Sequence, residues 1–231
     1  MLVSMENLYG LIVMGDWGNP RYLLSQVLIV VSLVLVATMY NVSNNRESKP
    51  LLFLLNGLGN ISSSLSFILL GVFPPAMTNG INAARDFINR YLAKRALRQG
   101  RMVDSKTSLK VVIVFLILIG FGAIISFHGN WFISIWSYLA ASFMTFMMYR
   151  NTVSDSDANA NLFRGGGFIL YSVWIAANFL IGSLFGVIYS TFFAFSSLRA
   201  LIIKKKPQSG TSNLEDAISF LQRKLLPIGR A

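Results

Sequence analysis

The stretch "TNGINAARDFINRY", residues 78–91, places three asparagines, two arginines and an aspartate in a region whose flanks are almost entirely apolar. Pro74 and Pro75 precede it, and proline is well tolerated in the first turn of a helix, where amide hydrogens have no partner within the helix. The polar residues recur at intervals of three and four, which places them on one helix face: Asn79, Asn82, Asp86 and Asn89. The stretch therefore predicts a helix over 74–94 with a polar face.

The composition of the whole chain indicates a membrane protein. Apolar residues make up 54% of the 231 residues and charged residues 13%, about half of the ~25% that is usual in soluble domains. The net charge of +11 would suggest nucleic acid as the partner of a soluble protein. Here the basic residues cluster between long apolar runs, as they do in cytoplasmic loops of membrane proteins, so no nucleic-acid partner is expected.

The chain has no cysteine, and His128 is its only histidine. These counts exclude a disulfide framework and a cysteine nucleophile, and they leave too few ligands for a zinc or haem site built by the protein. We therefore expect no metal and no cofactor.

Seven stretches are candidates for membrane-spanning helices, because each is close to the roughly 20 residues that cross the hydrocarbon core. They cover residues 22–41, 51–72, 74–94, 108–127, 131–149, 165–182 and 184–203. The expected fold class is all-α: a polytopic membrane protein of seven transmembrane helices.

The positions of the basic residues support seven spans. Of the 20 lysines and arginines, Arg21 alone belongs to the face that holds the short outer turns, and Arg85 lies within a span. The others lie in or beside the loops of the opposite face. Because lysine and arginine accumulate on the cytoplasmic side, the N-terminus is predicted outside and the C-terminus inside. Omitting the weakly apolar span 74–94 would mix the two sets of loops.

Arg85 is the deepest charge in that span. It lies about eleven residues from the outer end, or roughly 16 Å at 1.5 Å per residue, near the middle of the bilayer. An arginine there costs about 2.5–3.5 kcal/mol on insertion scales, so we expect it to face the interior of a helix bundle. Asp86 and Arg90, four residues apart in the favourable order, are predicted to pair and to neutralise part of the charge. The alternative is a structural ion pair between Asp86 and Arg85 itself.

The chain contains an internal repeat. A shift of 111 residues places "SFILLG" over "ANFLIG", so that Gly71 meets Gly182. Each unit then reads helix, basic loop, helix, tight turn, helix. A single linker helix between the units gives both the same orientation, with a pseudo-symmetry axis along the membrane normal. Under the shift Arg85 corresponds to Ser196, and Asn82 corresponds to Phe193, so the polar face belongs to the first unit alone.

The predicted organisation has five segments. They are an extracytoplasmic or interfacial N-terminal segment (1–21), a first three-helix unit (22–94), a basic cytoplasmic loop with the linker helix (95–129), a second three-helix unit (130–206) and a cytoplasmic amphipathic tail (207–231).

Two stretches, "LLGVFPPAMTNGINAARDFI" (69–88) and "WIAANFLIGSLFG" (174–186), resemble the YgjV family of bacterial inner-membrane proteins. The residues that carry the resemblance are Leu69, Leu70, Gly71, Pro75, Asn82, Ala83 and Arg85, and then Asn178, Phe179, Gly182 and Ser183. The resemblance covers about residues 22–206. It implies a location in the bacterial inner (plasma) membrane and no particular reaction.

The three-plus-one-plus-three layout is similar to that of SWEET and PQ-loop sugar carriers. Those carriers have a Pro-Gln pair in their spans and use proline hinges. This chain has no Pro-Gln pair in its first or fifth span, and all its prolines lie outside predicted helix interiors: Pro20, Pro50, Pro74, Pro75, Pro207 and Pro227. We therefore expect the layout without the hinge.

A solute pathway is expected where polar side chains face the bundle interior. The second span contributes amides at helical spacing together with Ser63 or Ser64, and the sixth places an aromatic ring and an amide one turn apart. The candidate pathway residues are Asn56, Asn60, Asn82, Arg85, Asp86, Trp174 and Asn178. The alternative role of these side chains is hydrogen bonding and packing between helices.

A small-solute transporter with a polar pathway centred on the third span is the favoured function. The alternative is a scaffold or accessory membrane protein that transports nothing. An enzyme is not expected, because Asp86 is the only acidic residue within a predicted span and no histidine or lysine lies deep in the membrane to activate a nucleophile. The expected partners are the lipid bilayer and a small polar or anionic solute, and a homo-oligomer is compatible with these features.

The topology can be tested directly, because the chain has no native cysteine. Single cysteines placed in 42–49, 95–107 or 151–163 should react with a membrane-impermeant thiol reagent only after the membrane is opened. Cysteines in 1–20 or 128–130 should react in intact spheroplasts. Labelling of a position in 95–107 in intact spheroplasts would contradict the predicted orientation.

Overall fold

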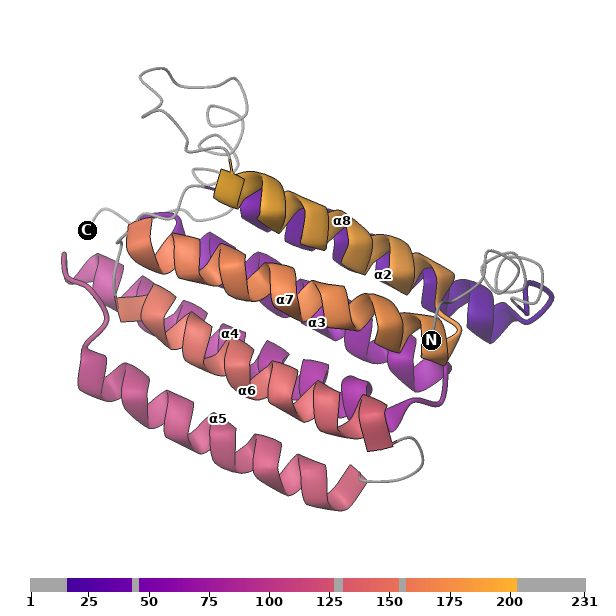
Figure 1. Ribbon diagram of the computed structural model, residues 1–231. Helices are drawn as coiled ribbons and strands as arrows, with labels where there is room; N and C mark the ends of the chain where they lie inside the picture. The colour runs from indigo at the N-terminus through magenta and orange to yellow at the C-terminus, as the bar shows by residue number, and fades with distance from the viewer. Residues whose placement is uncertain (1–15, 43–45, 127–130, 154–156, 203–231) are drawn as a thin grey trace.

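The computed structural model describes residues 16–42, 46–126, 131–153 and 157–202. These residues form seven α-helices and no strand (Figure 1): α2 (Pro20–Asn41), α3 (Lys49–Leu69), α4 (Phe73–Arg98), α5 (Ser105–Ser126), α6 (Trp131–Val153), α7 (Asp157–Ile181) and α8 (Leu184–Ile202). The predicted all-α class is confirmed, and each helix overlaps one predicted span. The predicted interfacial segment before residue 16 and the amphipathic tail lie outside the described residues.

Four helices, α2, α3, α5 and α6, are long and apolar enough to cross a membrane. The apolar parts of α7 and α8 are shorter, and α4 does not meet this criterion because of its charged and amide residues. Helix α4 packs against α3, α5 and α6. These neighbours shield its polar face from lipid, which explains how so polar a helix can lie in an apolar bundle.

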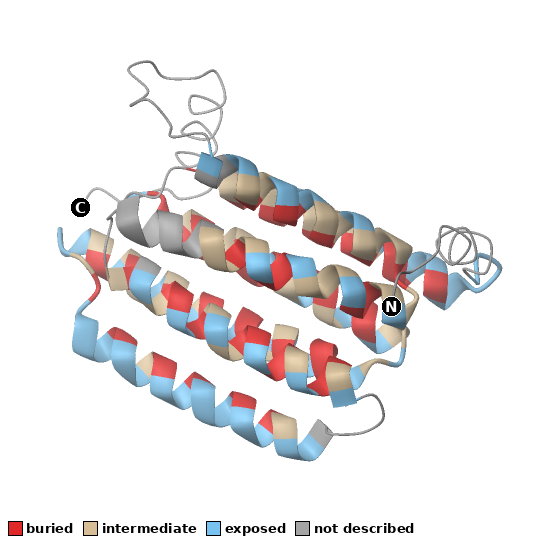
Figure 2. Cartoon of the chain, in the orientation of Figure 1, coloured by how far each residue is buried: buried red, intermediate tan, exposed pale blue. Residues whose placement is uncertain are grey.

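Six of the helices form a closed ring. Around the ring, α2 packs on α3, α3 on α4, α4 on α6, α6 on α7, α7 on α8, and α8 returns to α2. The two units, α2–α4 and α6–α8, therefore meet along two seams, α4–α6 and α8–α2. Helix α5, the predicted linker, packs against α4 and α6 from outside, and most of its surface is exposed (Figure 2).

The turns that join α3 to α4 and α7 to α8 have the same geometry. Each contains a glycine with positive φ, Gly71 at +72° and Gly182 at +78°. In each, the glycine amide donates to the carbonyl three residues earlier, and the next amide donates to the carbonyl five residues before it. This is the Schellman motif, in which glycine adopts the left-handed conformation without steric penalty. The repeat seen in the sequence thus extends to the backbone of the turns.

Serines hold α2 against α3. Ser62 Oγ donates to the carbonyl of Leu28 at 2.6 Å. Ser32 Oγ donates to the carbonyl of Gly59 at 3.0 Å, and Ser63 Oγ lies 2.8 Å from Ser32 Oγ. The serine-rich run of α3 therefore acts as a set of hydrogen bonds between helices, which suits hydroxyl groups at hydrocarbon depth.

Helix α5 begins with a side-chain cap. The Asp104 carboxylate accepts hydrogen bonds from the Thr107 amide at 2.9 Å and the Thr107 hydroxyl at 3.0 Å. These two bonds, led by the amide, hold the pKa of the Asp104 carboxyl below its usual value. The cap fixes where the polar loop ends and the apolar helix starts.

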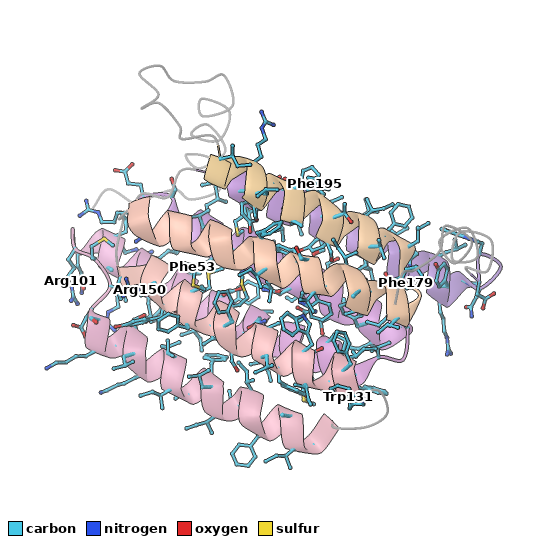
Figure 3. All side chains as sticks on the ribbon, in the orientation of Figure 1. Phe53, Arg101, Trp131, Arg150, Phe179 and Phe195 are labelled. Carbon is cyan, nitrogen blue, oxygen red and sulfur yellow. The ribbon has the colours of Figure 1, made fainter. Side chains whose placement is uncertain are left out.

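Two apolar clusters fill the end of the bundle that lies next to the basic loops. One contains Val36, Met39, Val42, Leu52, Tyr171, Phe193 and Ala194. The other contains Phe53, Ala93, Ala96, Val103 and Met148. Figure 3 shows Arg101 and Arg150 at this end of the bundle, and Trp131 and Phe179 at the opposite end. The basic end is therefore closed by packed side chains.

The turn geometry predicts that alanine destabilises the protein where it replaces a glycine with positive φ, and not where it replaces a glycine within a helix. Gly182→Ala should lower the free energy of unfolding by about 1–2 kcal/mol, because an L-residue at positive φ brings its Cβ close to the next carbonyl oxygen. No atom lies within 4 Å of a Cβ added at Gly182, so the loss would come from the backbone alone.

Gly120→Ala is the matched control, since a Cβ there also meets nothing within 4 Å and the residue has ordinary helical φ. It should leave stability unchanged or raise it slightly. Unfolding of the purified protein in mixed micelles measures both variants, and equal losses at the two positions would contradict the assigned turn.

Candidate functional site

Arg85 and Asp86 form an ion pair inside the bundle, at the middle of α4. Arg85 Nε and Nη2 donate to Asp86 Oδ1 at 2.9 and 2.8 Å. The two residues are 1% and 0% exposed, so neither charge is solvated by bulk water. Arg85 Nη1 donates to Asn82 Oδ1 and to Thr145 Oγ1, both at 2.9 Å. The guanidinium thus joins α4 to α6 across a seam between the two units.

The second carboxylate oxygen of Asp86 joins α4 to α3. Asn56 Nδ2 donates to Asp86 Oδ2 at 2.6 Å, and Asn60 Nδ2 donates to it at 3.0 Å. Both carboxylate oxygens therefore have donors, as a buried carboxylate requires. The pair and its amides form one electrically neutral network that spans three helices.

The predicted pairing of Asp86 with Arg90 is wrong. The Asp86 side chain faces α3 and is bound by Arg85 and two asparagines, while Arg90 Nε is buried without a hydrogen-bond partner among the described residues. The error arises because the rule that pairs residues four apart applies to side chains on the exposed surface of a single helix. The Asp86 carboxylate is instead buried between helices, where the adjacent arginine can reach it.

A cavity of about 90 Å³ lies beside this network and is lined by all six ring helices. Residues at equivalent positions of the two repeat units line its walls. Six pairs of lining residues are related by the shift of 111: Ile29 and Ala140, Asn60 and Tyr171, Ser63 and Trp174, Phe67 and Asn178, Thr78 and Tyr189, and Asn79 and Ser190. Equivalent positions of the two units therefore line one cavity between them.

The two walls of the cavity differ in chemistry. The wall from α3 and α4 presents amides and hydroxyls, whereas the equivalent wall from α7 and α8 presents the rings of Tyr171, Trp174 and Tyr189. Phe67 of the first unit stacks on Trp174, with ring centroids 6.2 Å apart and planes 29° apart. One wall thus forms hydrogen bonds, and the other offers flat apolar surfaces.

Asn178 contributes an unpaired polar group to the aromatic side. Its Nδ2 donates to Ser190 Oγ at 3.0 Å, and its buried Oδ1 has no hydrogen-bond partner among the described residues. The residue is 4% exposed. A buried amide oxygen normally has a donor, so this atom, which packs beside Gly186, is a candidate acceptor for a donor that enters the cavity.

The cavity lies mostly in the half of the bundle next to the Gly71 and Gly182 turns, away from the basic loops. On the basic side it meets an aromatic cluster around Phe193, which is 0% exposed. The ring centroid of Phe193 lies 5.2 Å from those of Tyr40 and Tyr171 and 4.9 Å from that of Tyr189. This cluster separates the cavity from the basic end.

A family model described as a bacterial inner membrane protein, Imp-YgjV, matches residues 23–206. The chain belongs to this family. No curated protein and no solved structure matches it. Family membership and the apolar helices make this Imp-YgjV chain a multi-pass protein of the bacterial inner membrane.

The structure brings the predicted pathway residues of this Imp-YgjV protein together. Six line the cavity: Asn56, Asn60, Asn82, Arg85, Trp174 and Asn178. Asp86 lies behind the wall, bonded to it. In the part of the chain that the structure describes, no group of three or more His, Cys, Asp or Glu side chains is placed to hold a metal ion.

Sequence reasoning missed Thr145, Tyr171 and Tyr189. The two tyrosines are the repeat partners of Asn60 and Thr78, so extending the shift of 111 from the turns to the helix faces would have found them. Thr145 gives no such signal, because a threonine within an apolar helix commonly bonds to its own backbone. It does so here, donating to the Ala141 carbonyl at 2.8 Å while accepting from Arg85.

A double-mutant cycle tests whether the ion pair acts as a unit. Arg85→Met should lower the free energy of unfolding by about 3–5 kcal/mol, because it leaves the Asp86 carboxylate buried without its counter-charge. Adding Asp86→Asn should restore part of that loss, since an amide oxygen can still accept from Asn56 and Asn60.

Unfolding in mixed micelles would measure the cycle, with Ile88→Ala on the exposed face of α4 as control. With Asp86→Asn measured alone as the fourth corner, a double variant whose loss equals the sum of the two single losses would show that the two charges are not coupled in the folded protein.

Proposed function

We propose that this Imp-YgjV protein transports a small solute across the bacterial inner membrane through the cavity. The observation that carries the proposal is the placement of the cavity, with equivalent residues of both units on its walls. In transporters built from repeats, the substrate site lies near the midplane between the repeats. A solute held there contacts both units, so movement of one unit against the other can change the side from which it is accessible.

The distribution of packing supports an outward-facing cavity. The cavity lies mostly in the half of the bundle next to the tight turns, and apolar and aromatic clusters fill the half next to the basic loops. If the basic loops are cytoplasmic, as the positive-inside rule predicts, the solute enters from outside. It then has to pass the rings around Phe193 to reach the cytoplasm.

The proposal needs neither catalysis nor a second chain. Apart from tyrosines, Arg85 is the ionisable residue that lines the cavity, and four of its five N–H groups donate to Asp86, Asn82 and Thr145. No general acid–base pair is therefore placed to act on a solute. The ring of six helices closes within one chain. The layout of SWEET and PQ-loop carriers supports the proposal by analogy of fold alone.

A scaffold that transports nothing is the second candidate, and one observation favours it. The network of Arg85, Asp86 and three asparagines ties helices together without any solute. Such hydrogen bonds are a usual means of joining membrane helices. The two functions differ in whether the empty space of the cavity is needed.

Filling the cavity distinguishes the two functions. Asn79 lines it and has no hydrogen bond among the described residues, so Asn79→Trp should occupy the space without breaking the ion-pair network. The transporter proposal expects the metabolite differences between cells with and without the wild-type chain to disappear in this variant. Membrane abundance should remain unchanged.

Ile88→Trp, on the 42%-exposed face of the same helix, is the matched control and should behave as the wild type. Mass-spectrometric profiling of medium and cells, with immunoblots of membranes, provides both readouts. Wild-type profiles from a well-inserted Asn79→Trp chain would favour the scaffold.

A further inference from the structure

The charges around the cavity restrict what it can hold. Resting on the proposed function, we infer that the site accepts an uncharged solute that both donates and accepts hydrogen bonds and that carries one apolar face. Three features of the cavity favour such a solute: the electrical neutrality of the wall, the polar atoms that remain unpaired, and the aromatic surface opposite them.

The wall carries no net charge. Arg85 and Asp86 neutralise each other at 2.8 Å. Of the five guanidinium N–H groups, four donate to Asp86, Asn82 and Thr145, which leaves one Nη2 hydrogen among the described contacts. An anion would meet this one N–H of a guanidinium whose charge Asp86 already neutralises. A bidentate contact with Arg85 would require it to displace Asp86 and leave that carboxylate buried with amides alone. A cation would find no free carboxylate, because both oxygens of Asp86 are occupied.

The polar atoms left over are both donors and acceptors. Asn60 uses Nδ2 on Asp86, so its Oδ1 remains as an acceptor. Asn82 accepts from Arg85 with Oδ1, so its Nδ2 remains as a donor. Across the cavity, Asn178 Oδ1 is buried and unpaired among the described residues. Hydroxyl or amide groups complement such a mixture, whereas a fully ionised group offers only acceptors or only donors.

The opposite wall favours a solute with a flat or apolar face. Trp174 is backed by Phe67, which fixes its ring. Tyr171 and Tyr189 lie beside it at the repeat positions of Asn60 and Thr78. An apolar face of the solute is removed from water when it packs against these rings, while the other edge of the solute reaches the amides.

The charge of the cavity can be measured with thiol reagents of opposite sign. Asn79→Cys, in the otherwise cysteine-free chain, places a thiol on the wall without touching the ion pair. The purified protein in detergent is treated with anionic sulfonatoethyl or cationic trimethylammonioethyl methanethiosulfonate. The ratio of the two rates, divided by the ratio for free 2-mercaptoethanol, should lie within about threefold of one, since a neutral pair exerts little net field.

Charge variants calibrate the measurement. Asp86→Asn in the Asn79→Cys background leaves Arg85 unpaired and should favour the anionic reagent by at least about tenfold. Should that variant fail to fold, Asn82→Asp keeps an acceptor for Arg85, adds a negative charge, and should favour the cationic reagent to a similar extent. A preference of tenfold or more for either charged reagent in the unaltered wall would overturn the inference.

A matched set of ligands tests the solute class. Nicotinamide, nicotinate and N1-methylnicotinamide share one flat ring and are neutral, anionic and cationic. Nicotinamide alone should slow the modification of Asn79→Cys, and Trp174→Ala should abolish that protection. Protection by either ion, or by none of the three at tens of millimolar, would contradict the inference.

Uptake measurements distinguish a failure of the proposed solute class from a failure of the transport proposal. Radiolabelled nicotinamide and nicotinate are followed into proteoliposomes that contain the wild-type chain. Saturable uptake of nicotinate alone would keep the transporter and reject the uncharged solute. A neutral, nicotinamide-protected cavity with no uptake of either compound would keep the binding site and reject transport.

Discussion

The Arg85–Asp86 ion pair determines how the first three-helix unit is built and where it meets the second. Removing two charges from water costs several kcal/mol for each ion, and the cost is offset only where the geometry supplies further hydrogen bonds. Here those bonds come from Asn56 and Asn60 on α3, from Asn82 on α4 and from Thr145 on α6. Three helices must therefore keep their relative positions for the pair to exist. The polar residues of α4 lower its tendency to enter a bilayer. The same residues form the hydrogen bonds that position α3 and α6 against it.

The second unit fills the equivalent space differently. At the shift of 111, Asn82 and Asp86 correspond to Phe193 and Ser197. Phe193 is fully buried among aromatic rings, so packing replaces the polar network there. The two units thus provide two chemistries on either side of the cavity that both line. The cavity takes its amphipathic character from this divergence, because each unit contributes one wall.

Much of the fold follows from the sequence alone, since spans, loops and charge placement depend on the thermodynamics of single segments. The polar face of α4 also follows, because a helix fixes the angular position of every side chain. The partner of Asp86 does not follow from helix spacing, which treats each helix as if it stood alone. Thr145 and the aromatic wall depend on which helices become neighbours around the ring. The order of helices around the ring depends on contacts between segments, and the internal repeat predicts only part of it.

The tight turns at Gly71 and Gly182 have a mechanical consequence. Because three residues connect α3 to α4 and two connect α7 to α8, each pair of helices has little freedom to change its crossing angle at that end. The contacts at the two seams then decide how the two units are held against each other. The α8–α2 seam is held near the turns by Tyr22 Oη, which donates to the Gly182 carbonyl at 3.3 Å, and by the Phe185 amide, which donates to Gln26 Oε1 at 3.1 Å. The α4–α6 seam is held deeper, by Arg85 and Thr145. The α8–α2 seam is also held nearer the basic end, where Tyr40 of α2 stacks on Phe193 of α8 with ring centroids 5.2 Å apart, so the two units are joined at more than one depth.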